Sequence, residues 1–139
     1  MVERKYVDVN VFVYWLAKHP EYGEAAREWV RRIEYGKRGE YVTSALTLYE
    51  LAVILAGLTG RGLRDRGLVE TTLKAVTGLP GLEVVALELE DCVKAVELME
   101  RYNLDYEDSL HLATAMRVKA EKIVSNDRDF DRTSLKRVF

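Results

Sequence analysis

The sequence has few of the residues that cross-link secreted domains or bind zinc. Its 139 residues include one cysteine, Cys92, and two prolines. A single thiol excludes an internal disulfide framework and cannot supply a zinc cluster. No apolar run is long enough for a membrane span, and the charged residues 3–5 are unlike a signal peptide. These absences predict a cytoplasmic protein with no membrane partner.

Neither sign of charge is in excess, because 21 basic and 23 acidic side chains leave a net charge of −2. Overall charge therefore does not indicate a nucleic-acid binder. Glutamine is absent and asparagine is rare, although 32% of the residues are charged. A hydrophobic content of 48% is typical of a folded protein and argues against disorder. The length fits one domain spanning residues 1–139.

Short apolar strands alternate with helical patterns along the chain. Strands are predicted at residues 5–9, 41–43, 82–86 and 122–125, and residues 135–139 could add a last one. Helices are predicted at 11–16, 21–35, 45–56 with Ser44 as N-cap, 68–76, 90–102 and 106–119. The glycine- and arginine-rich residues 57–67 read as an exposed connection. This alternation predicts an α/β fold: a mostly parallel sheet with helices on both faces.

Acidic residues follow two of these strands. Asp8 lies near the end of the first strand, and Asp127 directly follows the fourth. Both should reach the carboxyl edge of a parallel sheet, where ligands bind in such folds. Glu50 lies about two turns into the helix after the second strand, among the apolar positions Leu46, Leu51 and Ile54. We therefore expect its carboxylate to point inward.

The stretch "LDYEDSLHLATAM" at residues 104–116 contains three more acids. On a helical wheel, Asp108 falls at the edge of the apolar arc, beside Leu112. Asp105 precedes the helix and is predicted to be its N-cap. Glu107 falls on the other side, near His111, and both are predicted to face solvent. Asp108 is thus the acid of this stretch expected to meet Asp8.

Converging carboxylates repel one another unless a cation lies between them. Oxygen-only ligands favour Mg²⁺ or Mn²⁺, which can activate water for attack at phosphorus. No histidine or cysteine is predicted to take part in this site. The sequence therefore predicts a metal-dependent phosphodiesterase site built from Asp8, Glu50, Asp108 and Asp127.

Four blocks of the chain together resemble the PIN-domain ribonucleases, and within them the VapC toxins of toxin–antitoxin pairs. These blocks are "YVDVNVFVYWL", "SALTLYEL", "DYEDSLHLATA" and "IVSNDRDFDR". The resemblance implies a three-layer α/β/α sandwich with a central parallel sheet. It also implies that Asp8, Glu50, Asp108 and Asp127 are the metal-binding set, and it places supporting roles on Asn10, Ser44, Ser125, Asn126 and Asp129.

The implied activity is endonucleolytic cleavage of RNA with Mg²⁺ or Mn²⁺. The implied partners are the RNA substrate, a cognate antitoxin protein and a second copy of the chain, since family members commonly form homodimers. Helices at 24–35 and 46–56 offer apolar residues for such an interface. Arg61, Arg64 and Arg66 are candidates for phosphate contacts, since an acidic pocket needs a basic rim to hold RNA.

Each of these assignments has a simpler alternative. Asp8 could cap the next helix, Asp127 could be a turn residue, and the arginines could belong to a solvated loop. Cys92 is most simply a small core residue. Two other functions remain open: an inactive PIN-like binding or scaffold module, and an RNA-processing nuclease without an antitoxin.

Overall fold

A computed structural model describes residues 3–139 as a three-layer α/β/α sandwich around a five-stranded sheet. Every strand pairing is parallel, and the strand order is β3-β2-β1-β4-β5. The strands are β1 (Lys5–Val7), β2 (Tyr41–Ser44), β3 (Leu82–Val85), β4 (Lys122–Val124) and β5 (Lys136–Val138). β1 is the central strand, and the connections leave it on either side, so the carboxyl ends of β1, β2 and β4 border one crevice.

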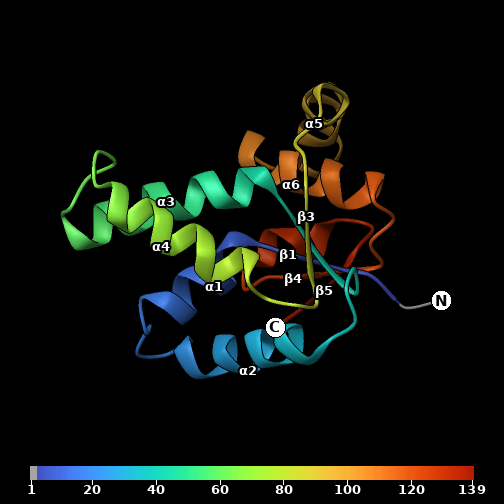
Figure 1. The fold of residues 1–139 in the computed structure, drawn as a ribbon. Helices are drawn as coiled ribbons and strands as arrows, with labels where there is room; N and C mark the ends of the chain where they lie inside the picture. Colours follow the sequence, from blue (N-terminus) through green and yellow to red (C-terminus); the bar gives the residue numbers. More distant parts are fainter. Residues whose placement is uncertain (1–2) are drawn as a thin grey trace.

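Six α-helices connect the strands (Figure 1). They are α1 (Val9–Leu16), α2 (Gly23–Tyr35), α3 (Ala45–Thr59), α4 (Arg66–Thr77), α5 (Leu89–Tyr102) and α6 (Tyr106–Arg117). A 3-10 helix, η1 (Arg128–Arg132), joins β4 to β5. In residues 3–139 no helix is both long and apolar enough to span a membrane.

The sheet separates two apolar cores, because successive side chains of a strand point to opposite faces. Val7 and Val124 lie in the core that includes buried residues of α1, α2, α3 and α4. Tyr6 and Ile123, one residue earlier in the same strands, lie in the core formed with α5 and α6. This alternation fixes the register of β1 against β4, where Tyr6 is paired with Ile123.

The sequence predicted all five strands and six α-helices of the described residues, but it misplaced several boundaries. β1 ends at Val7 rather than residue 9, because Asp8 accepts a hydrogen bond from the Val9 N–H and caps α1. α3 continues past Gly57 to Thr59, and Gly60, with φ of 69°, ends it in the left-handed conformation. α4 begins at Arg66, so the connection after α3 is shorter than residues 57–67. The predicted turn at 126–132 contains the helix η1.

Ser44 is the N-cap residue of α3, as predicted, although its side chain makes no capping bond and its hydroxyl lies 3.0 Å from the Tyr6 hydroxyl. One smaller expectation was wrong. Cys92 is only partly buried on α5, so it is not a core residue. Asp105 caps α6 as expected, because its carboxylate accepts a hydrogen bond from the Asp108 N–H at 2.8 Å.

Candidate active site

Asp8 lies directly after the central strand, with only 4% of its surface exposed. Its carboxylate accepts hydrogen bonds from the Val9 N–H at 2.8 Å, the Ser125 hydroxyl at 2.7 Å and the Asn10 amide at 3.3 Å. Burial raises the pKa of Asp8 and the nearby Glu50 charge adds to this, although His111 and the hydrogen bonds oppose the rise. Asp8 therefore caps α1 and also presents a fixed carboxylate at the carboxyl edge of the sheet.

The ends of β1 and β4 are joined by a polar network. The Asn10 side chain donates to the Ser125 hydroxyl at 3.1 Å and accepts from the Asn126 N–H at 3.3 Å. The Ser125 hydroxyl in turn accepts from the Asp127 N–H at 3.0 Å. The predicted supporting residues Asn10, Ser125 and Asn126 thus hold Asp8 and Asp127 in a common frame.

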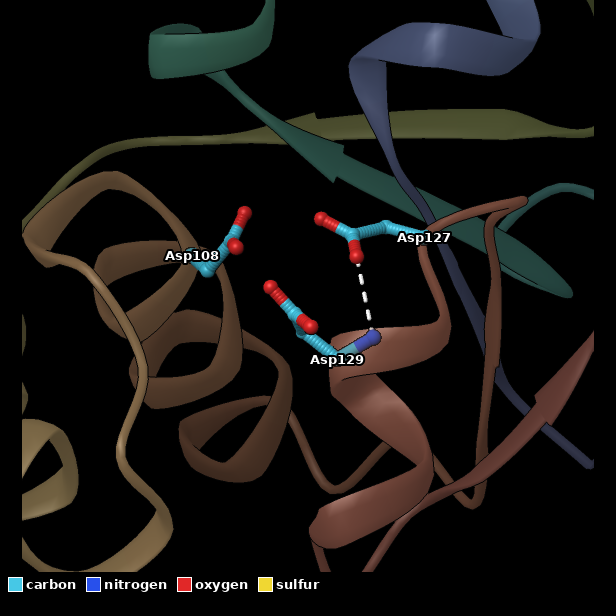
Figure 2. Close-up of side chains that lie close together, drawn as sticks. All are labelled: Asp108, Asp127 and Asp129. Carbon is cyan, nitrogen blue, oxygen red and sulfur yellow. Dashed lines mark hydrogen bonds between the residues drawn. The ribbon is translucent and has the colours of Figure 1, made fainter.

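Three carboxylates meet beside this network. One oxygen from each of Asp108, Asp127 and Asp129 lies within 4.8 Å of the other two. Figure 2 shows the three side chains pointing toward one another, from the start of α6 and the start of η1. The Asp127 carboxylate accepts a hydrogen bond from the Asp129 N–H at 2.9 Å, and this caps η1. The sequence had given Asp129 only a supporting role, whereas it is a member of this group.

The pKa of Asp108 reflects its burial and its acidic neighbours. Burial and the charges of Asp127, Asp105 and Asp8 raise the pKa of Asp108 to about 8. The Asp108 carboxylate therefore binds a proton at neutral pH in the absence of a cation. A group of like charges that favours a proton in this way would also favour a divalent cation.

Glu50 is buried, as predicted, but it lies beside a histidine and outside the group of three aspartates. Its Oε1 atom lies 2.5 Å from Nε2 of His111. Nδ1 of the same ring lies 2.7 Å from the Tyr6 hydroxyl, and Nε2 lies 3.9 Å from Oδ1 of Asp8. Burial opposes the charge on Glu50, but the hydrogen bonds from His111 and Glu107 outweigh it and lower its pKa.

The expectation that His111 faces solvent was therefore wrong. His111 is 1% exposed, because α6 is buried on almost every side from Ser109 to Ala115. Burial opposes the charged ring, yet Tyr6, the hydrogen bond to Glu50 and the charges of Asp8 and Glu50 raise its pKa well above its usual range. A signal was present in the sequence: His111 follows Asp108 by three residues and so lies near it on the helix surface.

Glu107 is exposed, as predicted, but it is not isolated from the site. Its hydrogen bond with Glu50 is the largest of the effects that raise the pKa of Glu107 to about 7. Glu107 and His111, both in α6, thus both affect the pKa of Glu50 in α3.

Arg61, Arg64 and Arg66 lie in and just after the connection between α3 and α4, at the end of α3 remote from Ser44. Nine residues of helix, or about 13 Å along the axis, separate Glu50 from the end of α3. Arg61 pairs with Asp65 at 2.6 Å, and Arg66 lies 3.9 Å from Glu70. These arginines therefore lie away from Asp108, Asp127 and Asp129.

The donor set suits a hard divalent cation. Carboxylate oxygens are the ligands that Mg²⁺ and Mn²⁺ prefer. Burial and then repulsion from neighbouring acids raise the pKa of Asp108, and a cation would relieve the repulsion. Asp108, Asp127 and Asp129 could bind such an ion, with Asp8 beside them.

An all-parallel α/β/α sandwich with clustered carboxylates at its carboxyl edge defines a class of domain suited to metal-assisted phosphodiester chemistry. The sequence matches the PIN domain family over residues 5–136. The chain belongs to the PIN-domain family, and this membership indicates a nuclease. No curated protein sequence matches the chain significantly.

Solved structures with the same fold include toxins of toxin–antitoxin pairs. VapC20 from Mycobacterium tuberculosis, described as a sarcin-ricin-loop-cleaving toxin, superimposes with a TM-score of 0.69 at 14% identity, covering 91% of this chain and 92% of its own. VapBC2 from Rickettsia felis, bound to promoter DNA, superimposes with a TM-score of 0.67 at 20% identity, and the match covers 99% of this chain and 98% of the matched chain. DNA-bound VapBC from Salmonella typhimurium superimposes with a TM-score of 0.63 at 17% identity, and the match covers 99% of this chain and 98% of the matched chain. The fold is thus the one that VapC toxins share.

Proposed function

We propose that the chain is an endoribonuclease dependent on Mg²⁺ or Mn²⁺ and that it is the toxin of a toxin–antitoxin pair. One observation carries the proposal: the carboxylates of Asp108, Asp127 and Asp129 converge beside Asp8 at the carboxyl edge of a PIN-domain sheet. A divalent ion at this position would lower the pKa of a bound water and polarise the phosphodiester.

The protein contributes a preformed acceptor set. Three donors orient Asp8 within the fold itself. Hydrogen bonds fix the backbone of both other segments, since Asp105 holds the first turn of α6 and Asp127 holds the first turn of η1. The ligands therefore need little rearrangement to bind an ion. Our proposed metal-binding and catalytic acids are Asp8, Glu50, Asp108 and Asp127. Asp129 joins them because of its position.

RNA cleavage is the direct test. Defined single-stranded and hairpin RNAs are incubated with the protein and Mg²⁺ or Mn²⁺, beside the variants D8N, D108N and E97Q. Glu97 is an exposed acid of α5 and provides a matched loss of one charge. We expect cleavage by the unmodified protein and E97Q, and a loss of at least about 100-fold in D8N and D108N. Cleavage that is equal in all four proteins would refute the site, and RNA binding without cleavage would favour the inactive binding module.

We propose that Arg61, Arg64 and Arg66 contact RNA beyond the scissile bond. They are exposed and lie at the far end of α3. Replacing all three by serine should weaken RNA binding more at low salt than at high salt and reduce the salt slope. Fluorescence anisotropy of a labelled RNA over a salt series would measure this. An unchanged slope would assign these arginines to the solvated loop.

The proposed partners are an antitoxin protein and a second copy of the chain, both in the cytoplasm. Support comes from the shared fold, since several of the matched structures are toxin–antitoxin complexes. Of the two helices expected to offer an interface, α2 buries Ala26, Val30 and Ile33, whereas α3 exposes Tyr49, Val53 and Leu58.

A neighbouring gene encoding a small DNA-binding protein would test the toxin assignment. Co-expression of that protein should abolish RNA cleavage, and the two chains should copurify. Light scattering of the toxin alone should give twice the mass of the chain. Full cleavage in the presence of the neighbour's product, or no such gene, would favour an RNA-processing nuclease.

A further inference from the structure

His111 connects the acidic site to two strands of the sheet. One side of its ring faces carboxylates: Nε2 lies 2.5 Å from Oε1 of Glu50 and 3.9 Å from Oδ1 of Asp8. The other side faces hydroxyl groups, because Nδ1 lies 2.7 Å from the Tyr6 hydroxyl, which also lies 3.0 Å from Oγ of Ser44. His111 and Ser44 are both buried. The contacts therefore run without interruption from β2 through β1 and α6 to Glu50 in α3.

The direction of the hydrogen bond to Glu50 follows from what each group can donate. An ionised carboxylate only accepts, so Nε2 carries the proton between them. Tyr6 has one hydroxyl proton. If Tyr6 gives it to Ser44, Nδ1 donates to Tyr6; if Tyr6 gives it to Nδ1, Nδ1 accepts. In both arrangements Nε2 donates to Glu50, and the Tyr6 hydroxyl fixes the plane of the ring from behind.

We propose that His111 is a positioning residue of the acidic site: it holds the Glu50 carboxylate in place beside Asp8 so that both contribute to divalent-cation binding. This inference rests on the proposed function. Glu50 has no backbone N–H donor among residues 3–139, unlike Asp8, and its side chain has three rotatable bonds. The donor on His111 supplies the orientation that the backbone supplies for Asp8. Donors that orient metal-facing carboxylates in this way commonly affect metal affinity by about 10- to 100-fold.

A second buried network on the same helix shows what a purely structural role looks like. Thr114, one turn beyond His111, donates to Asp91 in α5 at 3.1 Å, and Asp91 also pairs with Arg117 at 2.9 Å. This network joins α5 to α6 and contacts none of the candidate metal-binding acids. T114V therefore serves as a control that disturbs a buried hydrogen bond of α6 away from the site.

Two substitutions of His111 separate positioning from packing. The amide nitrogen of glutamine reaches the place of Nε2, whereas that of asparagine reaches only the place of Nδ1. H111Q thus keeps a donor for Glu50 and weakens the contact with Tyr6. H111N keeps a contact with Tyr6 and removes the donor for Glu50. Both remove a buried ring, so both should lower the midpoint of urea unfolding by similar amounts.

Binding of Mn²⁺ to the purified proteins, followed by electron paramagnetic resonance or calorimetry, is the decisive measurement. We expect the dissociation constant to rise about 10- to 100-fold in H111N and to stay within about threefold of the unmodified protein in H111Q and T114V. Y6F, which removes only the hydroxyl behind the ring, should give a smaller loss of about three- to tenfold. Y6F keeps the inference testable if H111N does not fold.

Each outcome decides a question. Equal Mn²⁺ affinities in H111N and H111Q, or affinities that follow urea stability across all variants, would overturn the inference and leave His111 a packing residue. Mn²⁺ binding that is lost in D108N but unchanged in H111N and Y6F would overturn the inference while supporting the proposed function. Failure of the unmodified protein to bind Mn²⁺ would overturn both.

Discussion

Replacing Asp108 by asparagine should stabilise the protein when no divalent cation is present, although it removes a proposed metal ligand. The pKa of Asp108 is raised from 3.8 to about 8 by burial and by the charges of Asp127, Asp105 and Asp8. The folded protein therefore holds a proton on Asp108 that the unfolded chain releases above about pH 4. A raised pKa contributes stability that is complete below the unfolded value and is lost as the pH rises through the folded value. Asparagine keeps the shape of the side chain and cannot become charged.

The size of the effect follows from the shift. One pKa unit corresponds to about 1.4 kcal/mol, so a rise from 3.8 to about 8 sets a ceiling of about 6 kcal/mol above pH 8. Asp108 is only partly buried, and solvent screens its charged neighbours. We therefore expect D108N to be more stable than the unmodified protein by about 1–3 kcal/mol at pH 8.5, with the difference near zero at pH 4.

Urea unfolding followed by circular dichroism, in the presence of a chelator and from pH 4 to pH 9, measures this difference. A second series with excess Mn²⁺ should reverse the order at pH 8, because an ion that binds only the folded state stabilises the protein by an amount that grows with the logarithm of the ion concentration divided by Kd. E97Q, which removes an exposed charge of α5, should change stability by less than about 0.5 kcal/mol in both series. A difference between D108N and the unmodified protein that does not grow with pH would refute the repulsion. Equal stabilisation of both proteins by Mn²⁺ would place the ion elsewhere.

Two further predictions concern stability alone and use the same unfolding assay. R117M leaves the buried Asp91 without its cation and should lower the free energy of unfolding by about 2–4 kcal/mol, without any change in Mn²⁺ affinity. G81A should be destabilising by more than about 2 kcal/mol, because an added Cβ would lie 2.2 Å from the Ile33 carbonyl oxygen. G57A is the matched control: Gly57 lies inside α3 with open space around it, so alanine should stabilise by about 0.5–1 kcal/mol.

Much of the fold was predictable because strand spacing, helical periodicity and the rules of parallel sheets agree with one another. The errors lie where one side chain or one backbone angle decides. The helix at 11–16 was predicted, but Val9, a residue type that favours strands, was assigned to the strand before it; Val9 begins α1 because Asp8 caps the helix there. Gly57 looked like a helix end, but the left-handed residue that ends α3 is Gly60.

The acids at the strand ends were predictable for a similar reason, since the carboxyl ends of parallel strands share one edge. The surroundings of Glu50 were not. A helical wheel sorts side chains by direction but does not reveal what lies in each direction. His111, on the same side of α6 as the exposed Glu107, is polar because it faces Glu50 in α3 and not because it faces water. A wheel drawn for α6 alone cannot distinguish a buried polar contact from a solvated surface.

The acids of the site differ in whether other groups of the protein donate hydrogen bonds to them. Asp8 accepts hydrogen bonds from three donors, and Glu50 has His111. Among residues 3–139, the side-chain partner of the Asp108 carboxylate is another acid, Asp127, and burial together with the charges of Asp127, Asp105 and Asp8 raises its pKa. Uncompensated repulsion is therefore concentrated at Asp108, where a cation would gain the most free energy. Asp8 and Glu50 also contribute to cation binding, but each already has protein donors, so D8N and E50Q should weaken Mn²⁺ binding less than D108N does.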